Sequence, residues 1–185
     1  MHKKVKVLYE RLSSNLFIFM RILGIDPGTA TTGFGIIEVT GGRFRPLNFG
    51  HIQTEKTYSQ AERLDQIAYD LALLCQQWRP TACAVEKLFF SKNVKTAMVV
   101  AEARGVILQT LKRSGYPIFE YNPGEIKMAI TGYGKATKDQ IQKMVVHHLQ
   151  LKQIPKPDDA ADALAIALCH AHHSRYQQRV ATPSS

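Results

Sequence analysis

Short apolar runs separated by turn residues fill the first part of the chain, and this pattern predicts three strands. The first run, RILGID, ends in an acid and is followed by the turn-rich segment PGTATTG. Gly41-Gly42 separates the second run from the third and marks a two-residue hairpin turn. The predicted strands are residues 21–26, 33–40 and 44–53. Because their connections are so short, these strands are expected to form an antiparallel meander.

Apolar residues spaced three and four positions apart predict helices after the meander. The first helix begins after Ser59, which forms a capping box with Glu62, and it ends before Pro80. The second helix spans residues 93–113 and stops at Gly115. The positions expected to face the sheet from this second helix are Ala97, Val100, Ala101, Ile107 and Leu111.

Two more strands and two more helices complete the pattern. The strands are residues 82–90, an apolar run with one acid in its middle, and residues 117–121. A capping box of Thr137 and Gln140 opens one helix, and the last helix spans about residues 158–172. A meander followed by alternating strands and helices predicts an α/β protein with a mixed sheet and helices on both of its faces.

Composition and charge narrow the class of protein. The chain has 185 residues, enough for one domain with a sizeable core, and its formal net charge is +9. Such a surplus is typical of proteins with polyanionic partners, either nucleic acid or an anionic membrane, although a merely soluble basic protein has it too. The apolar-flanked cysteines Cys75, Cys83 and Cys169 indicate reduced thiols in a cytoplasmic protein. Since no apolar run is long enough to span a bilayer, no membrane partner is expected.

The same patterns divide the chain into three parts. Residues 1–19 form an N-terminal extension of uncertain status, whose basic start and short apolar patch resemble a weak signal sequence without a cleavage site. Residues 20–173 form the single domain, and residues 174–185 form a polar C-terminal tail expected to fray.

Four carboxylates stand where apolar residues would be expected. Asp26 ends the first strand, Glu86 lies inside an apolar strand, and Asp159 and Asp162 share one face at the start of the last helix. A buried carboxylate is costly unless it is compensated, and several together also repel one another. A divalent cation would resolve both problems, and hard oxygen ligands suit Mg²⁺ or Mn²⁺ better than zinc.

Each acid also has a purely structural interpretation. Asp26 could accept hydrogen bonds in a turn, Glu86 could pair with Lys87, and Asp158 or Asp159 could cap a helix. Taken singly, the structural interpretation is favoured for each residue. Taken together, the four favour a site, because a carboxylate in the middle of an apolar strand is the hardest to explain otherwise.

A second cluster, of histidines near the C-terminus, has a spacing that suggests metal binding. His170, His172 and His173 fall within one turn of the last predicted helix. Terminal helices more often carry solvated histidines, and we favour that interpretation here.

Four segments resemble the signature blocks of the RuvC family of Holliday junction resolvases, and they occur in the same order. The similarity covers about residues 20–172, nearly the whole chain. The segments are LGIDPGTATTGFG (23–35), AVEKLFFSKN (84–93), EARG (102–105) and DAADALAIA (159–167). This resemblance implies an RNase H-like fold with a five-stranded sheet in the order 3-2-1-4-5.

The resemblance further implies a structure-selective DNA endonuclease that resolves four-way junctions in recombination and repair. Asp26, Glu86, Asp159 and Asp162 would be its catalytic carboxylates and its metal ligands. They would hold two Mg²⁺ ions, with Mn²⁺ as a substitute, and hydrolysis would leave 5′-phosphate and 3′-hydroxyl ends. Asp158 departs from the family motif and is interpreted as a helix cap or an outer charge.

Several DNA contacts follow from the same resemblance. Phe89 would stack on an unpaired base, and Lys92 would contact a phosphate. Lys127 and Lys138 match basic positions near the scissile phosphate, more so than Lys135. The alternatives are that Phe89 packs in the core and that the lysines are ordinary surface charge.

A two-fold homodimer is expected, because a four-way junction has two strands of like polarity to cut. The candidate dimer surface is the helix at residues 93–113, where Met98, Val99 and Val106 lie off the sheet-facing stripe. Alternatively, Met98 and Val99 could pack under the last helix of the same chain. A branch-migration complex of the RuvA and RuvB kind is a further partner that the resemblance implies.

Three other functions are compatible with parts of this pattern. An actin-like ATPase has a similar phosphate-binding hairpin, but such proteins need two domains of this kind and the chain has room for one. A DNA-binding module without catalysis would not need all four acids. An RNase H-like nuclease acting on structured RNA shares the fold, but the AVEKLFF and DAADALAIA segments are more similar to RuvC.

Overall fold

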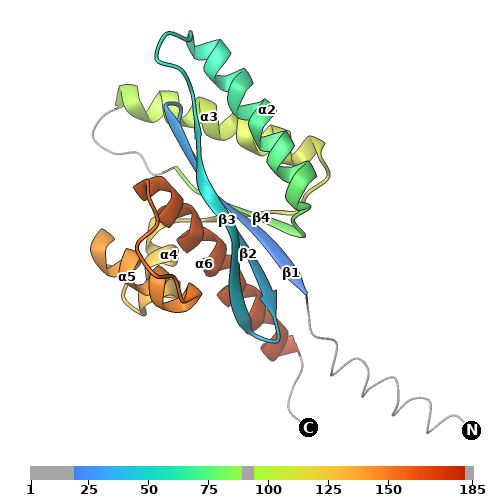
Figure 1. Cartoon of the computed structure of the whole chain (residues 1–185), viewed down its shortest axis with the longest axis vertical. Helices are drawn as coiled ribbons and strands as arrows, with labels where there is room; N and C mark the ends of the chain where they lie inside the picture. The colour runs from blue at the N-terminus through green and yellow to red at the C-terminus, as the bar shows by residue number, and fades with distance from the viewer. Residues whose placement is uncertain (1–18, 89–93, 182–185) are drawn as a thin grey trace, which may run out of the picture.

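The computed structural model describes residues 19–88 and 94–181, with side chains described for residues 19–88 and 97–174. Three strands open the chain, and helices and strands then alternate (Figure 1). The strands are β1 (Met20–Asp26), β2 (Thr31–Thr40), β3 (Arg43–Gln53), β4 (Ala82–Glu86) and β5 (Ile118–Tyr121). The helices are α2 (Gln60–Trp78), α3 (Val94–Arg113), α4 (Pro123–Thr131), α5 (Lys138–Leu149) and α6 (Asp158–Ala181).

The sheet has the order β3-β2-β1-β4-β5, which confirms the predicted strand order and fold class. The β1–β2 and β2–β3 pairs are antiparallel, whereas β4 pairs in parallel with both β1 and β5. The predicted hairpin at Gly41-Gly42 is also confirmed. Both glycines have positive φ, 58° and 77°, as a two-residue turn of the type I′ class requires.

Two cores lie on opposite faces of the sheet, because successive strand residues point to alternate sides. Leu23 and Val85 pack with α2 and α3, whereas Ile22, Ile37 and Ala84 pack with α4, α5 and α6. Figure 1 shows the pair α2 and α3 on one side of the strands and the three later helices on the other. Each face of the sheet is therefore covered by its own helical layer.

Helix α6 packs against the sheet at the distance of backbone contact. An added Cβ at Gly24 in β1 would lie 2.1 Å from the carbonyl oxygen of Ala163, and one at Gly35 would lie 2.8 Å from the amide nitrogen of Leu164. Glycine is required at these positions because any side chain would push the helix away. The Ala-rich sequence of α6 matches this close packing, and the helix is buried from Ala160 to Ala165 except at Asp162.

Two predicted boundaries were wrong. Strand β4 ends at Glu86 rather than at residue 90, because both neighbouring strands end there too: β1 stops at Asp26 and β5 at Tyr121. Helix α6 ends at Ala181 rather than at residue 172, so the helix enters the segment that was expected to be a frayed tail. No helix-stopping residue occurs after residue 172 until Pro183.

One helix was missed and one helix face was partly misassigned. Asn122 and Glu125 form a capping box that opens α4, a signal that the sequence carries but that was not used. On α3, Ala103 is fully buried and Ala101 is exposed, the reverse of the prediction for Ala101. Residues two positions apart on a helix point in directions about 200° apart, so burial of Ala103 turns Ala101 towards solvent.

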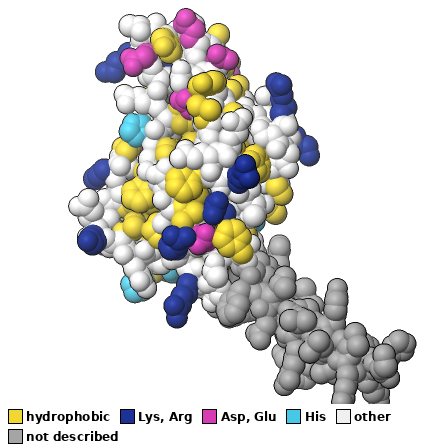
Figure 2. All heavy atoms as spheres, turned by 45° about the vertical axis from the view of Figure 1, so that its right-hand side comes forward, with side chains coloured by type: hydrophobic (Ala, Val, Ile, Leu, Met, Phe, Trp, Pro, Cys, Tyr) yellow, Lys and Arg dark blue, Asp and Glu magenta, His cyan; other side chains and the backbone are white. Residues whose placement is uncertain are grey.

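One face of the described surface has its charges unevenly distributed. Figure 2 shows most of its Asp and Glu side chains near the upper end, at the height of α2 and α3 in Figure 1, while Lys and Arg side chains are spread over the whole height of the face. Within the described residues, no helix has both the length and the apolar character needed to cross a membrane. Cys75, Cys83 and Cys169 are buried free thiols, as predicted.

Candidate active site

The topology of the sheet brings the first two acids to one edge. Strands β1 and β4 are parallel neighbours, and Ile25 pairs with Val85. The residues that follow them, Asp26 and Glu86, therefore end the two strands side by side. Both side chains are half-buried.

The third and fourth acids reach the same edge from α6. Asp159 and Asp162 lie in the first turns of this helix. Gly33 pairs with Asp26 across the β1–β2 ladder, and an added Cβ at Gly33 would lie 2.1 Å from the carbonyl oxygen of Asp159. The backbone of α6 therefore touches the sheet directly beside Asp26, and the four predicted carboxylates converge.

The other three acids affect the ionisation of Asp26. Burial, followed by the charges of Glu86, Asp162 and Asp159, raises the pKa of Asp26 to about 8. Burial also raises the pKa of Glu86, and a hydrogen bond with Asp26 opposes that shift. In this arrangement a protonated Asp26 donates to an ionised Glu86. Two carboxyl groups thus share a proton where a cation would allow both to ionise.

The donor set fits a divalent cation of the hard class. All four side chains offer carboxylate oxygens, and the raised pKa of Asp26 reports a local excess of negative charge that a cation would neutralise. In residues 19–88 and 94–181, however, no three His, Cys, Asp or Glu side chains are already gathered closely enough to hold a metal ion. Ligation by all four would therefore require rotation of side chains at this edge.

Two lysines face the carboxylates across a small cavity. The cavity has a volume of about 210 Å³, and its lining includes Glu86, Lys127, Lys138 and Asp162. The Lys138 ammonium lies 3.1 Å from a carboxylate oxygen of Asp162, and the charge of Lys127 lowers the pKa of Glu86 against the larger effect of burial. Both lysines predicted to lie near the scissile phosphate are therefore at the site.

The flanking charges lie further out. Asp158 is partly exposed and pairs with Lys156 at 3.0 Å and with Lys138 at 3.4 Å. These pairs agree with the prediction that Asp158 is a charge outside the site. Lys135 is exposed and does not line the cavity. Phe89 and Lys92, the two remaining predicted DNA contacts, lie outside the described residues.

Arg104 is part of the framework of the site, although no role was predicted for it from the sequence. Its guanidinium donates a hydrogen bond of 3.1 Å to the main-chain carbonyl of Glu86 and pairs with the carboxylate of Glu120 on β5. It therefore fixes the end of β4 to α3 and β5. Its place in the EARG segment was the available signal, but spacing alone does not reveal a contact across 18 positions.

The C-terminal histidines differ from the solvated cluster that was expected. His170 is 3% exposed, and its Nδ1 lies 2.7 Å from the hydroxyl of Tyr121, while its Nε2 lies 3.2 Å from that of Ser174. Burial lowers the pKa of His170 to about 4, so the ring is neutral near pH 7. His173 Nδ1 lies 3.0 Å from the carbonyl oxygen of Cys169. The contact with Tyr121 joins α6 to β5, whereas the other two lie within α6.

Comparison with known proteins identifies close relatives over most of the chain. Residues 22–170 match the family described as Crossover junction endodeoxyribonuclease RuvC. The protein of that name from Heliobacterium modesticaldum is 53% identical over 83% of this chain and 94% of its own. The one from Thermotoga petrophila is 51% identical over 84% of this chain and 94% of its own.

Solved structures agree with these relatives. Thermus thermophilus RuvC in complex with a Holliday junction substrate superposes with a TM-score of 0.81 and 36% identity, covering 85% of this chain and 96% of that one. The yeast mitochondrial Holliday junction resolvase has a TM-score of 0.62 at 14% identity, covering 95% of this chain and 91% of that one, and shares the fold.

Proposed function

The chain belongs to the RuvC family of crossover junction endodeoxyribonucleases, and we propose that it resolves four-way DNA junctions by hydrolysing phosphodiester bonds at the edge formed by Asp26 and Glu86. The protein is thus a nuclease of recombination and repair. The observation that carries the proposal is the convergence of four carboxylates on a half-buried Asp26 whose pKa is raised to about 8. Such a concentration of acids is costly for the fold, and it is explained by a metal-dependent reaction.

Asp26, Glu86, Asp159 and Asp162 are proposed to be both the catalytic residues and the ligands of the cation. The family implies dependence on a divalent metal in general. Oxygen-only ligands favour Mg²⁺, with two ions per site and Mn²⁺ as a substitute. When bound, the cation supplies Lewis acidity for activating water and for stabilising the leaving 3′ oxygen.

The lysines of the cavity are proposed to hold the scissile phosphate. A phosphate that enters beside Asp162 would compete for the Lys138 ammonium, which now pairs with that carboxylate at 3.1 Å. Lys127 on α4, which lines the same cavity as Glu86, would neutralise charge on the phosphate. The site therefore pairs carboxylates for the cation with ammonium groups for the DNA.

A two-fold homodimer is proposed as the active form, since two like strands of the junction must be cut. Met98 on α3 is 61% exposed, and α3 lies on the opposite face of the sheet from α6 (Figure 1). This arrangement argues against the alternative that Met98 packs under α6. We also propose that Phe89 stacks on a base and that Lys92 contacts a phosphate. The proposed partner is a RuvA–RuvB motor, and the proposed location is the cytoplasm.

One cleavage assay tests the function. The protein is incubated with a synthetic four-way junction, a linear duplex of the same sequence, structured RNA and ATP, each with and without Mg²⁺. We expect paired incisions in the junction only with the metal, leaving 5′-phosphate and 3′-hydroxyl ends. Equal cutting of the linear duplex, preferential cutting of RNA, or hydrolysis of ATP without DNA cleavage would refute junction resolution.

A further inference from the structure

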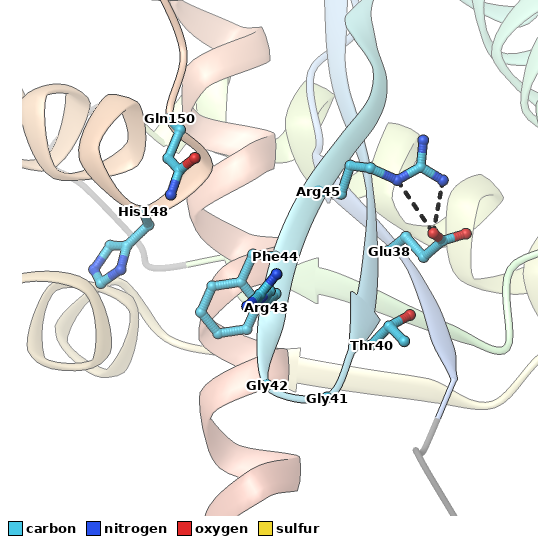
Figure 3. A pocket seen from close by; sticks show the side chains of 9 residues that line it. All are labelled: Glu38, Thr40, Gly41, Gly42, Arg43, Phe44, Arg45, His148 and Gln150. Carbon is cyan, nitrogen blue, oxygen red and sulfur yellow. Dashed lines mark hydrogen bonds and ion pairs between the residues drawn. The ribbon is translucent and has the colours of Figure 1, made fainter.

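A groove surrounds the β2–β3 hairpin at the end of the sheet away from the carboxylates. Its volume is about 870 Å³, and it is lined by hairpin residues between Glu38 and Arg45 together with His148 and Gln150 from the end of α5. Figure 3 shows Phe44 pointing from the hairpin towards α5, whereas Arg45 and Glu38 lie together on the other side of the hairpin. Phe44 contacts the His148 ring edge-on, with centroids 6.4 Å apart, and this contact joins the hairpin to the helix within the groove.

The groove carries a surplus of positive charge. Its one carboxylate, Glu38, pairs with Arg45 at 2.6 Å and with Arg21 at 3.5 Å, and these bonds, Arg45 first, lower its pKa. Glu38 is thus already matched by two guanidinium groups. Arg43 is exposed at the hairpin turn and has no acidic partner among the described residues. An anion that enters the groove therefore meets unmatched positive charge.

Helix α5 connects this groove to the candidate active site. Its first residue, Lys138, pairs with Asp162, and His148 near its other end lines the groove. The ten helical steps from Lys138 to His148 cover roughly 15 Å. Strand β2 gives a similar separation, since the seven steps from Gly33 beside Asp26 to Thr40 at the turn cover roughly 23 Å. Helix α5 and strand β2 therefore each reach from one site to the other.

We propose that this groove binds the phosphate backbone of the duplex arm that leaves the cleavage site, with Arg43 as its main contact. The inference rests on the proposed function. The separation of roughly 20 Å corresponds to about six base pairs of duplex, at about 3.4 Å for each nucleotide of a strand. Because α5 carries both ends of this path, an arm whose phosphate meets Lys138 would pass the hairpin about half a helical turn later. The glycines of the turn carry no side chains, so the rim next to Arg43 stays open.

Arm length separates this groove from the cleavage site experimentally. Wild-type protein and Arg43→Ala are titrated, without metal, with junctions whose arms are about four or about sixteen base pairs long. An interstrand cross-link keeps the short arms paired. Arg43→Lys tests whether charge is sufficient, and Arg113→Ala, an exposed arginine at the end of α3 on the opposite face, is the matched control.

On long arms, Arg43→Ala is expected to bind roughly tenfold more weakly, the effect of one charged hydrogen bond. The slope of log affinity against log salt should fall by about one. Arg43→Lys should recover most of the loss, Arg113→Ala should bind as the wild type does, and the difference should vanish on short arms that end before the groove.

Two results would overturn the proposal. The first is that Arg43→Ala binds long-arm junctions as tightly as the wild type does, which would leave the groove to an acidic protein segment. The second is that Arg43→Ala loses the same affinity for junctions of both arm lengths. A separate control distinguishes these outcomes from failure of the proposed function: wild-type protein that neither binds nor cuts the long-arm junction would refute junction resolution itself.

Discussion

Gly33 of β2 and Asp159 of α6 are in backbone contact: an added Cβ on Gly33 would lie 2.1 Å from the Asp159 carbonyl oxygen and 2.6 Å from its carbonyl carbon. Gly33 is also the ladder partner of Asp26. One glycine therefore sets the separation between the acid on the sheet and the acids on the helix. A backbone carbonyl cannot move aside as a flexible side chain would, so a methyl group here must displace α6.

The first prediction is that Gly33→Ala disrupts the site while leaving all four acids in the chain. We expect junction cleavage to fall by about 100-fold, since a displacement of about 1 Å at the reacting groups has an effect of that size. The free energy of unfolding should fall by about 1–3 kcal/mol through overpacking. Gly134→Ala is the matched control, because its Cβ would meet only a Met128 side-chain carbon at 3.7 Å. Full activity of Gly33→Ala would show that α6 can shift without consequence.

This contact also illustrates what the sequence could not predict. The strand containing Gly33 and the helix containing Asp159 were both predicted from local patterns. The strand order was predicted from the family resemblance. No local pattern shows that a glycine touches a residue 126 positions later. The convergence of the acids is a tertiary property, fixed where the helix backbone meets the strand.

Boundaries failed where a neighbouring element determined them. The apolar sequence ACAVEKLFF favours a strand to residue 90, but β4 ends at Glu86 since β1 and β5 offer no further backbone partners. Burial of His170 was missed for a similar reason. Its burial depends on Tyr121 of β5, which is 49 positions away in the sequence. The missed α4, in contrast, was readable, because Asn122 and Glu125 form a capping box.

The second prediction concerns the proposed metal ligands. Asp26→Asn and Glu86→Gln keep the shape of the side chain but remove a ligand charge, so Mg²⁺-dependent cleavage should fall by several orders of magnitude. Junction binding without metal should persist or tighten, because repulsion between the carboxylates and the phosphates decreases. Asp65→Asn, an exposed acid on α2, should behave as the wild type. Cleavage is measured in single-turnover reactions, and binding is measured by the fluorescence anisotropy of a labelled junction. Rapid metal-dependent cutting by Asp26→Asn would contradict the mechanism.

The third prediction concerns stability and pH without metal. The pKa of Asp26 is raised to about 8, mainly by burial, so between about pH 4 and pH 8 the folded protein retains a proton that the unfolded chain has lost. The contribution of Asp26 to stability must therefore fall as pH rises through this window and level off above pH 8. The raised pKa values of Glu86 and Asp162 act in the same direction.

Asp26→Asn removes this titration, so its advantage in stability over the wild type should grow with pH. At about pH 8, with chelator present, we expect Asp26→Asn to be more stable than the wild type by roughly 2 kcal/mol, or about 5 °C in Tm. This is less than the full pKa shift implies, because the site is partly open to water. At about pH 5 the difference should be much smaller. Thermal denaturation at both pH values measures it, and an advantage that shrinks with rising pH would contradict the assigned direction of the pKa shift.

The fourth prediction separates phosphate positioning from general DNA affinity. Lys138→Ala and Lys127→Ala remove ammonium groups from the cavity that Glu86 and Asp162 also line. We expect the cleavage rate at saturating junction to fall about 100-fold. The dissociation constant without metal should change by less than about threefold, since the carboxylates of Glu86 and Asp162 beside these lysines offset their attraction for a phosphate. Lys112→Ala, exposed at the end of α3, is the control. A loss of affinity equal to the loss of rate would make both lysines ordinary binding residues.

The last prediction is that the first half of α3, around Met98, provides the dimer surface. Met98 is 61% exposed on this helix, while Ala97, Ala103 and Ile107 turn inward, so an apolar side chain remains uncovered within one chain. Met98→Glu would place a charge in a two-fold interface opposite its own copy, and like charges there repel. Sedimentation at micromolar concentration should therefore change from dimer to monomer. Met128→Glu is a control of the same residue type, since Met128 on α4 is 54% exposed on the other face of the sheet and should leave the dimer intact. The monomeric variant should nick junctions without the paired incisions of the wild type, because one site reaches only one of the two strands. A wild-type protein that is strictly monomeric, with and without junction, and still cuts both strands would refute the dimer.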